Sequence, residues 1–147
     1  SEALLYAADR AHHVASKIAP ALAKGQVVIT DRFLDSSVAY QGAGRELDLD
    51  EVRNLSLWAV NNLLPDLTVL LDLDAEQAAK RRGQTGEAPD RLEREKIEFF
   101  EAARSSYLDL AKAEPKRFFV VDANKAPEAI WSEIQVRLDQ VLESKGL

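Results

Sequence analysis

The sequence predicts an α/β domain in which a parallel sheet has helices on both faces. Three short apolar runs, at 26–30 (QVVIT), 67–73 (LTVLLDL) and 117–122 (RFFVVD), have the composition of strands that are covered on both sides. Helical patterns of ten or more residues separate the runs, and strands that alternate with long helices favour βαβ units. Because open sheets usually have more strands, we expect the sheet to be incomplete in this chain.

The first helix is expected over 3–22, where apolar residues recur at three-to-four spacing. Lys24 and Gly25 supply its end, and Pro20 is expected to bend its last turn. Its predicted apolar stripe consists of Leu4, Ala8, Ala11, Ala15, Ile18 and Leu22.

A second helix is expected over 51–64, with Asp50 as its N-cap and Pro65 after its end. Trp58 falls at a core position of this helix, as Trp131 does in the last helix, so both tryptophans are predicted to pack in the interior.

The remaining helices are expected at 75–82, 90–114 and 126–145. The first two are separated by GQTGEAP, whose two glycines and proline predict a loop. Pro115 ends the long middle helix before the third strand.

Composition limits the function classes. The 147 residues are 46% hydrophobic and 30% charged, with a formal net charge of -6, which fits a soluble globular domain and disfavours coating of nucleic acid or an anionic membrane. The absence of cysteine excludes disulfides, thiolate zinc sites and cysteine nucleophiles. No apolar run reaches the roughly 20 residues of a membrane span, and the first residues lack signal-peptide order. We therefore expect a soluble intracellular protein.

A polar segment, DRFLDSSVAYQG at 31–42, follows the first predicted strand directly. Ligands of open α/β sheets bind beyond the carboxyl ends of strands, where this segment would lie. Arg32 can take two oxygens of a phosphate, and Asp31 can hold a hydrated magnesium ion or orient an attacking oxygen. The neutral groups that suit a base or sugar are Ser36, Ser37, Tyr40 and Gln41. Asp31 and Arg32 fit equally a salt bridge in a surface turn.

Two further groups of residues suit a nucleotide. Tyr6 and Arg10 lie four residues apart on one helix face, where a ring and a guanidinium can hold a planar base, although a solvent-facing pair has the same spacing. The segment 79–95 carries cations on both sides of a loop, which can close over phosphates. These cations are Lys80, Arg81, Arg82, Arg91 and Arg94. Nearby carboxylates also allow an ordinary exposed charge network.

The motifs together resemble bacterial thymidylate kinase. They appear in order as YAADR at 6–10, DRF at 31–33 with SSVAYQG at 36–42, PDLTVLLD at 65–72 and DRLE at 90–93. The resemblance covers the whole chain, and the segment 31–42 and the later DRLE are its most specific parts.

The resemblance implies a P-loop kinase-like three-layer sandwich with a parallel sheet, as one domain over 1–147 with a lid at about 80–94. It implies phosphoryl transfer from ATP to dTMP, giving dTDP and ADP for dTTP biosynthesis, with Mg²⁺ as cofactor. It also implies a cytoplasmic homodimer with no nucleic-acid or membrane partner.

The family's roles transfer to matching positions. Tyr6 would stack on the base, where phenylalanine is more usual, and Arg10 would contact thymine. Arg32 would grip the dTMP phosphate, and Asp31 would help to place the metal and that phosphate. The other substrate-binding positions would be Ser36, Ser37, Tyr40 (against the sugar 2′ position) and Gln41. The lid arginines near the ATP phosphates would be Arg81, Arg82 and Arg91, with Arg91 catalytic together with Asp31 and Arg32. Residues 121–127 (VDANKAP) would lie by the adenine.

The chain departs from the family in having no glycine-rich G-x-x-x-x-G-K-S/T loop. It resembles the carboxyl-terminal part of the kinase, beginning inside the helix that carries Tyr6. In the family, the strand before that loop lies between the strand ending at Thr30 and the strand ending near Leu73. We therefore expect unpaired strand edges, and a chain that is inactive by itself.

Two alternatives remain open at this point. One is another nucleoside monophosphate kinase, because the strand-exit Asp-Arg is shared more widely. The other is a non-catalytic nucleotide-binding or dimerisation module that retains the acceptor site.

Overall fold

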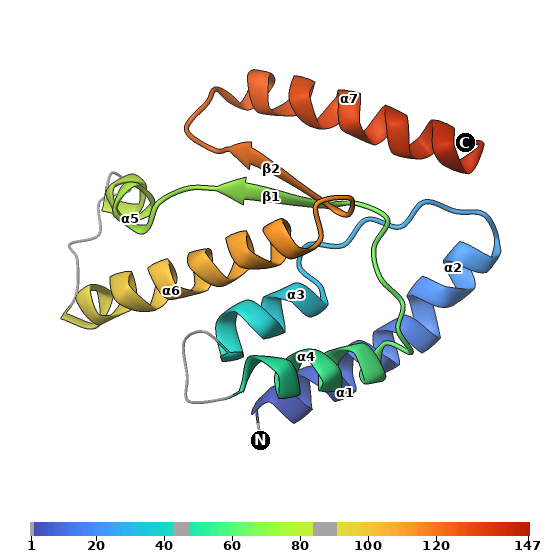
Figure 1. The fold of residues 1–147 in the computed structure, drawn as a ribbon, viewed down its shortest axis with the longest axis horizontal. Coiled ribbons are helices and arrows are strands. Elements are labelled where there is room, and N and C mark those ends of the chain that lie inside the picture. Colours follow the sequence, from blue (N-terminus) through green and yellow to red (C-terminus); the bar gives the residue numbers. More distant parts are fainter. Residues whose placement is uncertain (1, 43–47, 84–90) are drawn as a thin grey trace. The chain divides into compact units, whose positions relative to one another are not determined.

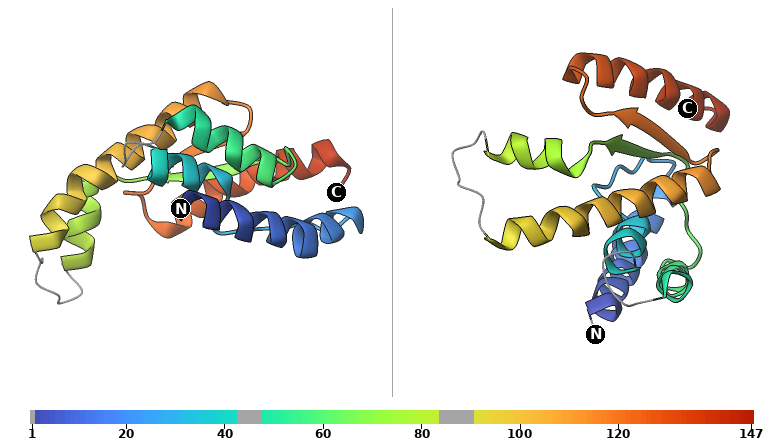
Figure 2. Two further views of the ribbon diagram at one scale, coloured as in Figure 1. Left: turned by 90° about the horizontal axis from the view of Figure 1, so that it is seen from below. Right: turned by 60° about the vertical axis from the view of Figure 1, so that its left-hand side comes forward.

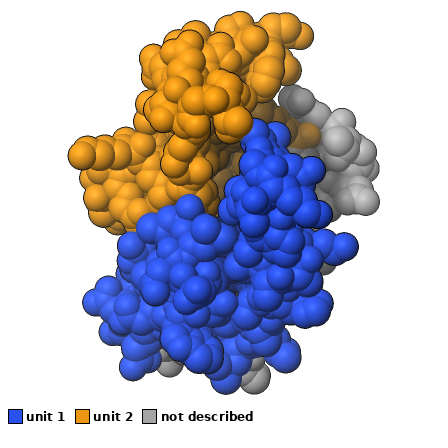
Figure 3. All heavy atoms as spheres, turned by 90° about the vertical axis from the view of Figure 1, so that its right-hand side faces the viewer, with its two compact units in different colours: residues 1–64 blue, residues 65–147 orange. Residues whose placement is uncertain are grey.

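The computed structural model describes residues 2–42, 48–83 and 91–147, without the side chains at 41–42, 82–83 and 91–96. It confirms a mixed α/β protein with a parallel strand pair. The chain divides into two compact units, residues 1–64 and residues 65–147, which Figure 3 colours separately. That 1–147 form one domain stays a prediction.

Unit 1 begins with a helical run made of α1 (Glu2–His13), a π-helical turn η1 (Val14–Ile18) and α2 (Ala19–Ala23), drawn in blue in Figure 1. The wide turn comes directly before Pro20, which has no N–H to donate and whose ring would clash with a carbonyl one turn back. The bend predicted at Pro20 stays a prediction, and the irregularity that the structure shows is the π turn before it. Gly25, at φ 72°, follows the end of the run as predicted.

The predicted apolar stripe of the first helix is only partly correct. Ala7, Val14 and Ile18 are the buried positions, whereas Leu4 is 61% exposed and Leu22 is 41% exposed. The buried positions are themselves seven and four residues apart, as on an ordinary helix, so a neighbouring face of the run packs in place of the predicted one. Helical spacing alone does not say which face has a neighbour. The core of unit 1 consists of Val14, Ile18, Leu34 and Val60.

The predicted strand at 26–30 is wrong in this structure. These residues have no strand assignment, and Val27 and Ile29 are 56% and 90% exposed. A strand needs a neighbour for its N–H and C=O groups, and the strand pairing in the described residues joins β1 (Thr68–Asp72) only to β2 (Phe118–Asp122). The β-branched composition remains, but the pairing that would turn it into a strand is absent.

The polar segment at 31–42 is helical in its second part. α3 (Leu34–Ser37) continues into η2 (Val38–Gly42), and α3 packs against α1 and α4 (Leu49–Ala59). Leu34 is completely buried, which anchors the segment in the core of unit 1.

Helix α4 differs from its prediction at both ends. Its N-cap is Asp48 and not Asp50, because the Asp48 carboxylate accepts hydrogen bonds from the N–H groups of Asp50 and Glu51 at 2.8 and 3.1 Å. The helix ends at Ala59 and not near 64. The prediction that Trp58 packs inside is wrong as well, since Trp58 is 80% exposed.

Unit 2 contains the strand pair β1 (Thr68–Asp72) and β2 (Phe118–Asp122), which is parallel and in register from Thr68 opposite Phe118 to Asp72 opposite Asp122. Its helices are α5 (Ala75–Gly83), α6 (Arg91–Ala113) and α7 (Pro127–Lys145), close to the predicted ranges. In Figure 1 and the right view of Figure 2 the strand pair runs between α6 and α7, both of which contact β2. Trp131, at 54% exposure, is a second tryptophan wrongly predicted to pack inside.

None of the helices within the described ranges is long and apolar enough to cross a membrane.

Candidate functional site

Unit 1 brings the predicted base-binding helix onto the polar segment. The Nη2 atom of Arg10, on α1, donates a hydrogen bond to the hydroxyl of Ser37, on α3, at 2.8 Å. The same guanidinium lies 5.9 Å from the ring centre of Phe33, which is close enough for a weak cation–π contact. Two groups of residues that are 27 positions apart in the chain therefore meet at one guanidinium.

Arg10 keeps hydrogen-bonding capacity that the described residues do not use. Its Nη1 atom is shielded from solvent and finds no acceptor among the side chains and backbone that the structure describes. Burial lowers the pKa of Arg10, and the nearby carboxylates of Asp9 and Asp35 oppose that shift. A shielded donor without an acceptor costs roughly 1–3 kcal/mol, which an incoming carbonyl oxygen would relieve.

Arg32 has an unusual backbone. Its φ is 63°, in the left-handed region that costs most side chains about 1–2 kcal/mol. The hydroxyl of Thr30 donates to the Arg32 carbonyl at 3.0 Å. At the other end of the residue, the guanidinium carbon lies 4.9 Å from the ring centre of Tyr40, and Nη2 is 3.5 Å from the Tyr40 hydroxyl. Arg32 is exposed, so its cation can meet an anion from solution.

The other predicted acceptor-site residues lie on α1, in the residues just before α3, and on α3 and η2. Tyr6 is 52% exposed, one helical turn before Arg10 on α1. Asp31 is exposed, whereas Ser36 is half-buried and its N–H donates to the carbonyl of Phe33 at 3.2 Å. Gln41 belongs to η2, and its side chain lies outside the described residues. The structure thus places Tyr6 on the helix that bonds to the polar segment.

Unit 2 carries a second polar group at the carboxyl end of β1. Arg104, on α6, donates to both carboxylate oxygens of Asp72 at 2.7 and 3.1 Å and to Glu101 at 2.8 Å. These bonds, above all those to Asp72, raise the pKa of Arg104. The second oxygen of Glu101 accepts from the N–H of Ala75, at the start of α5, at 3.3 Å. The group therefore ties the end of β1 to the beginning of α5.

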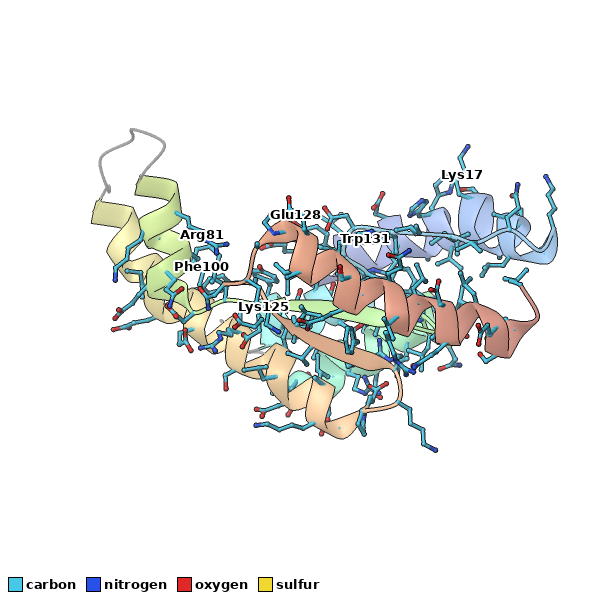
Figure 4. All side chains as sticks on the ribbon, turned by 90° about the horizontal axis from the view of Figure 1, so that it is seen from above. Lys17, Arg81, Phe100, Lys125, Glu128 and Trp131 are labelled. Atoms are coloured by element: carbon cyan, nitrogen blue, oxygen red, sulfur yellow. The ribbon has the colours of Figure 1, made fainter. Side chains whose placement is uncertain are left out.

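The loop after β2 lies at the same end of the strand pair. Arg81, on α5, donates to the carbonyl of Ala123 at 2.9 Å, and the Ala123 N–H donates to the carbonyl of Asp72 at 2.9 Å. Figure 4 labels Arg81 and Lys125 in this part of unit 2. The Asn124 N–H bonds to the Asp122 carboxylate at 2.8 Å, which lowers the pKa of Asp122. One of the predicted lid arginines thus contacts the segment 121–127.

The predicted lid at about 80–94 includes the end of α5 and the start of α6. Residues 84–90 lie outside the described part, and so do the side chains of Arg82 and Arg91. No group of three or more histidine, aspartate and glutamate residues that could hold a metal occurs in the described ranges.

Three residues that contact the predicted site residues or neighbouring elements were not predicted from the sequence. Thr30 and Asp35 are next to predicted residues, and Asp35 is only 4% exposed. A single hydroxyl or carboxylate beside a motif does not form a recognisable sequence pattern. Arg104 was missed because its partner Asp72 lies 32 residues earlier. The one sequence feature that pointed to this pair was the position of Asp72 near the end of a predicted strand.

Comparison with known proteins agrees with the sequence motifs and the fold. The sequence model of the family described as "Thymidylate kinase" matches residues 1–134. A protein named thymidylate kinase from Leifsonia xyli subsp. xyli is 62% identical over 139 residues, which are 95% of this chain and 66% of that protein. A protein named thymidylate kinase from Clavibacter sepedonicus is 59% identical over 93% of this chain and 65% of its own length.

A more distant relative carries the same name. The thymidylate kinase of Pelotomaculum thermopropionicum is 44% identical over 98% of this chain and 67% of its own length. The chain spans about two thirds of the length of the curated relatives it matches. Because both the family model and these relatives match nearly all of its residues, the chain belongs to the thymidylate kinase family.

Proposed function

We propose that this protein transfers the γ-phosphoryl group of ATP to dTMP, giving dTDP and ADP for dTTP biosynthesis. The observation that carries the proposal is the hydrogen bond from Arg10 to Ser37, which joins the aromatic helix face to the segment of Asp31 and Arg32. Family membership supports the same reaction.

The proposed base site uses α1 and the polar segment. Tyr6 stacks on the thymine ring, and Arg10 donates to a thymine carbonyl through the nitrogen that Ser37 does not occupy. Ser36 and Gln41 supply further neutral hydrogen bonds. Tyr40 lies against the sugar and disfavours a 2′-hydroxyl.

The proposed phosphate site uses Arg32 and Asp31. The exposed guanidinium of Arg32 binds the dTMP phosphate by paired N–H donors, and the Tyr40 ring limits the directions that the guanidinium takes. Asp31, directly before it, orients the attacking phosphate oxygen and the metal. In this arrangement the residues contribute position and charge, which are the main needs of phosphoryl transfer.

The proposed donor side belongs to unit 2 and the lid. Residues 121–127 lie beside the adenine, and Arg81, Arg82 and Arg91 neutralise charge on the ATP phosphates, with Arg91 acting in the transition state. Mg²⁺ fits Asp31 because this ion often binds one or two carboxylates and takes its other ligands from phosphates and water. When bound, it neutralises charge on the transferred group.

We further propose a cytoplasmic homodimer that has no nucleic-acid or membrane partner. Several large apolar side chains of α1 and α4 are exposed to solvent, among them Leu5 at 71% and Trp58 at 80%. Exposed apolar surfaces of this kind favour a protein partner. The formal net charge of -6 disfavours nucleic acid.

The test of the reaction uses the product of the complete gene, with Mg²⁺ and ATP, in a coupled assay of ADP formation. We expect turnover with dTMP at a higher kcat/KM than with dUMP, dCMP or AMP. A preference for one of the other acceptors would replace dTMP as the substrate.

Calorimetry of the same gene product with each nucleotide separately distinguishes an enzyme from a binding module. A kinase binds both dTMP and ATP, whereas a module that retains only the acceptor site binds dTMP and ignores ATP. Binding of neither nucleotide would refute the proposal.

A further inference from the structure

Arg32 has a left-handed backbone conformation that its own side chain does not explain. Among the described non-glycine residues, positive φ angles occur at Arg32, Asn61 and Asn62. Asparagine tolerates this region because its short amide bonds to nearby backbone, and both asparagines follow the end of α4. Arginine has no such short polar group, so something outside the side chain must hold the conformation.

Thr30 supplies the contact that favours this conformation. Its hydroxyl donates to the carbonyl of Arg32 at 3.0 Å, which closes a small turn around Asp31. The β-branched side chain has few χ1 rotamers, so the hydroxyl is held in place with little loss of freedom. The bond is made to the backbone of Arg32, which leaves the guanidinium available for a ligand.

The direction of the Arg32 side chain depends on this turn. Because the sign of φ sets where Cβ leaves the chain, a return to negative φ would move the guanidinium away from the ring of Tyr40, 4.9 Å distant. Two contacts therefore hold Arg32: Thr30 bonds to its backbone carbonyl, and Tyr40 lies against its guanidinium.

We propose that Thr30 is a positioning residue for the nucleotide phosphate, acting through the left-handed backbone of Arg32. The proposal rests on the proposed function, in which Arg32 receives the dTMP phosphate. Thr30 holds the backbone, the backbone aims the guanidinium, and the guanidinium binds the anion. Its effect is therefore confined to ligands that carry a phosphate.

Comparison of dTMP with thymidine measures this effect, because the two share the base and sugar and differ in the phosphate. We expect Thr30→Val, which keeps the shape and removes the donor, to weaken dTMP binding by about 3- to 10-fold, the range for one lost hydrogen bond. Thymidine binding stays unchanged. Thr30→Ser, which keeps the hydroxyl, retains most of the affinity for dTMP.

The matched control is Thr68→Val, in β1. Its hydroxyl also makes one hydrogen bond, accepting from Arg117 at 3.0 Å, but it belongs to the other unit. This variant is expected to leave the affinities for dTMP and thymidine unchanged, even where it lowers the melting temperature. It separates a general loss of stability from a loss of positioning.

A double-mutant cycle tests the route through Arg32. Arg32→Ala removes the phosphate contact, so adding Thr30→Val to it should cause no further loss of dTMP affinity. Nuclear magnetic resonance gives a readout without ligand, because the coupling between the amide and α protons of Arg32 reports φ and is expected to change in Thr30→Val. If Thr30→Val does not fold, Thr30→Ala serves in the same measurements.

Three results overturn the inference. In the first, Thr30→Val weakens the binding of dTMP and of thymidine equally. In the second, that variant binds dTMP as tightly as the unmodified protein. In the third, the losses of dTMP affinity caused by Thr30→Val and Arg32→Ala add in the double variant. In each case the unmodified protein still binds dTMP, so the proposed function stands. If the unmodified protein binds neither ligand, the proposed function and the inference fall together.

Discussion

Arg10 is the residue at which helix α1 and the polar segment meet, and Ser37 is its described side-chain partner. Ser37 is 6% exposed, so its hydroxyl acts in a site that is largely closed to water. A hydrogen bond to a charged group in such a place is stronger than one at the surface. The pair therefore has both a structural effect and a proposed binding effect.

Ser37→Ala is expected to lower the free energy of unfolding by about 1–3 kcal/mol, because a second nitrogen of Arg10 would lose its acceptor. Urea unfolding measures the change. The control is Ser132→Ala, whose exposed hydroxyl bonds to the carbonyl of Glu128 in its own helix and whose loss should stay within about 0.5 kcal/mol. Equal losses in the two variants would contradict the structural role given to Ser37.

At the scale of elements, the group around Arg104 joins three of them. Asp72 ends β1, Glu101 and Arg104 lie on α6, and the N–H of Ala75 opens α5. The side chains of Arg104 and Asp72 are 30% and 24% exposed, so water only partly screens the paired hydrogen bonds. Since α5 leads towards the predicted lid, this group also sets where that segment leaves the sheet.

Arg104→Ala should lower the free energy of unfolding by about 1–3 kcal/mol, because it leaves Asp72 without its paired donor. A double-mutant cycle with Asp72→Asn gives the interaction free energy between Arg104 and Asp72. Lys112→Ala serves as the control on the same helix, since its ion pair with Asp109 is 77% and 69% exposed and should contribute about 0–1 kcal/mol. A coupling near zero would show that the pair is incidental.

At the scale of the whole molecule, the apolar surface of α1 and α4 predicts self-association. Leu5→Glu or Trp58→Glu should convert a dimer into monomers, because a charge buried in an apolar interface loses its hydration. Analytical ultracentrifugation measures the mass. Val136→Glu is the control, since Val136 is 62% exposed on α7 of the other unit. A dimer that survives all three changes would place its interface elsewhere, and a monomeric parent protein would refute the homodimer.

The lack of a phosphate-binding loop gives a second prediction at this scale. A polypeptide of these 147 residues alone contains no G-x-x-x-x-G-K-S/T motif, so it should bind ATP poorly and transfer no phosphate. The coupled assay with dTMP measures this, with the product of the complete gene as the positive control. Appreciable turnover by the 147 residues alone would contradict the reason given.

Helices were predictable because their signals are local. The ranges of α5, α6 and α7 follow from apolar spacing together with prolines and glycines, and each helix makes its hydrogen bonds within its own segment. The N-cap of α4 was placed two residues late, because Asp48 and Asp50 carry the same side chain and only the geometry distinguishes them. The exposed tryptophans were missed because helical spacing does not say which face has a neighbour.

The sequence by itself determined the α/β class, most helices, the paired strands and the motifs that identify the family. Tertiary structure decided which polar groups meet, since Arg10 and Ser37 lie on elements far apart in the chain and the bond between them forms only when α1 and α3 pack. It also decided that residues 26–30 form no strand. The physical reason is that strand pairing and contacts between elements depend on residues far apart in the chain, whereas helices, motifs and the turn from Thr30 to Arg32 depend on neighbours in sequence.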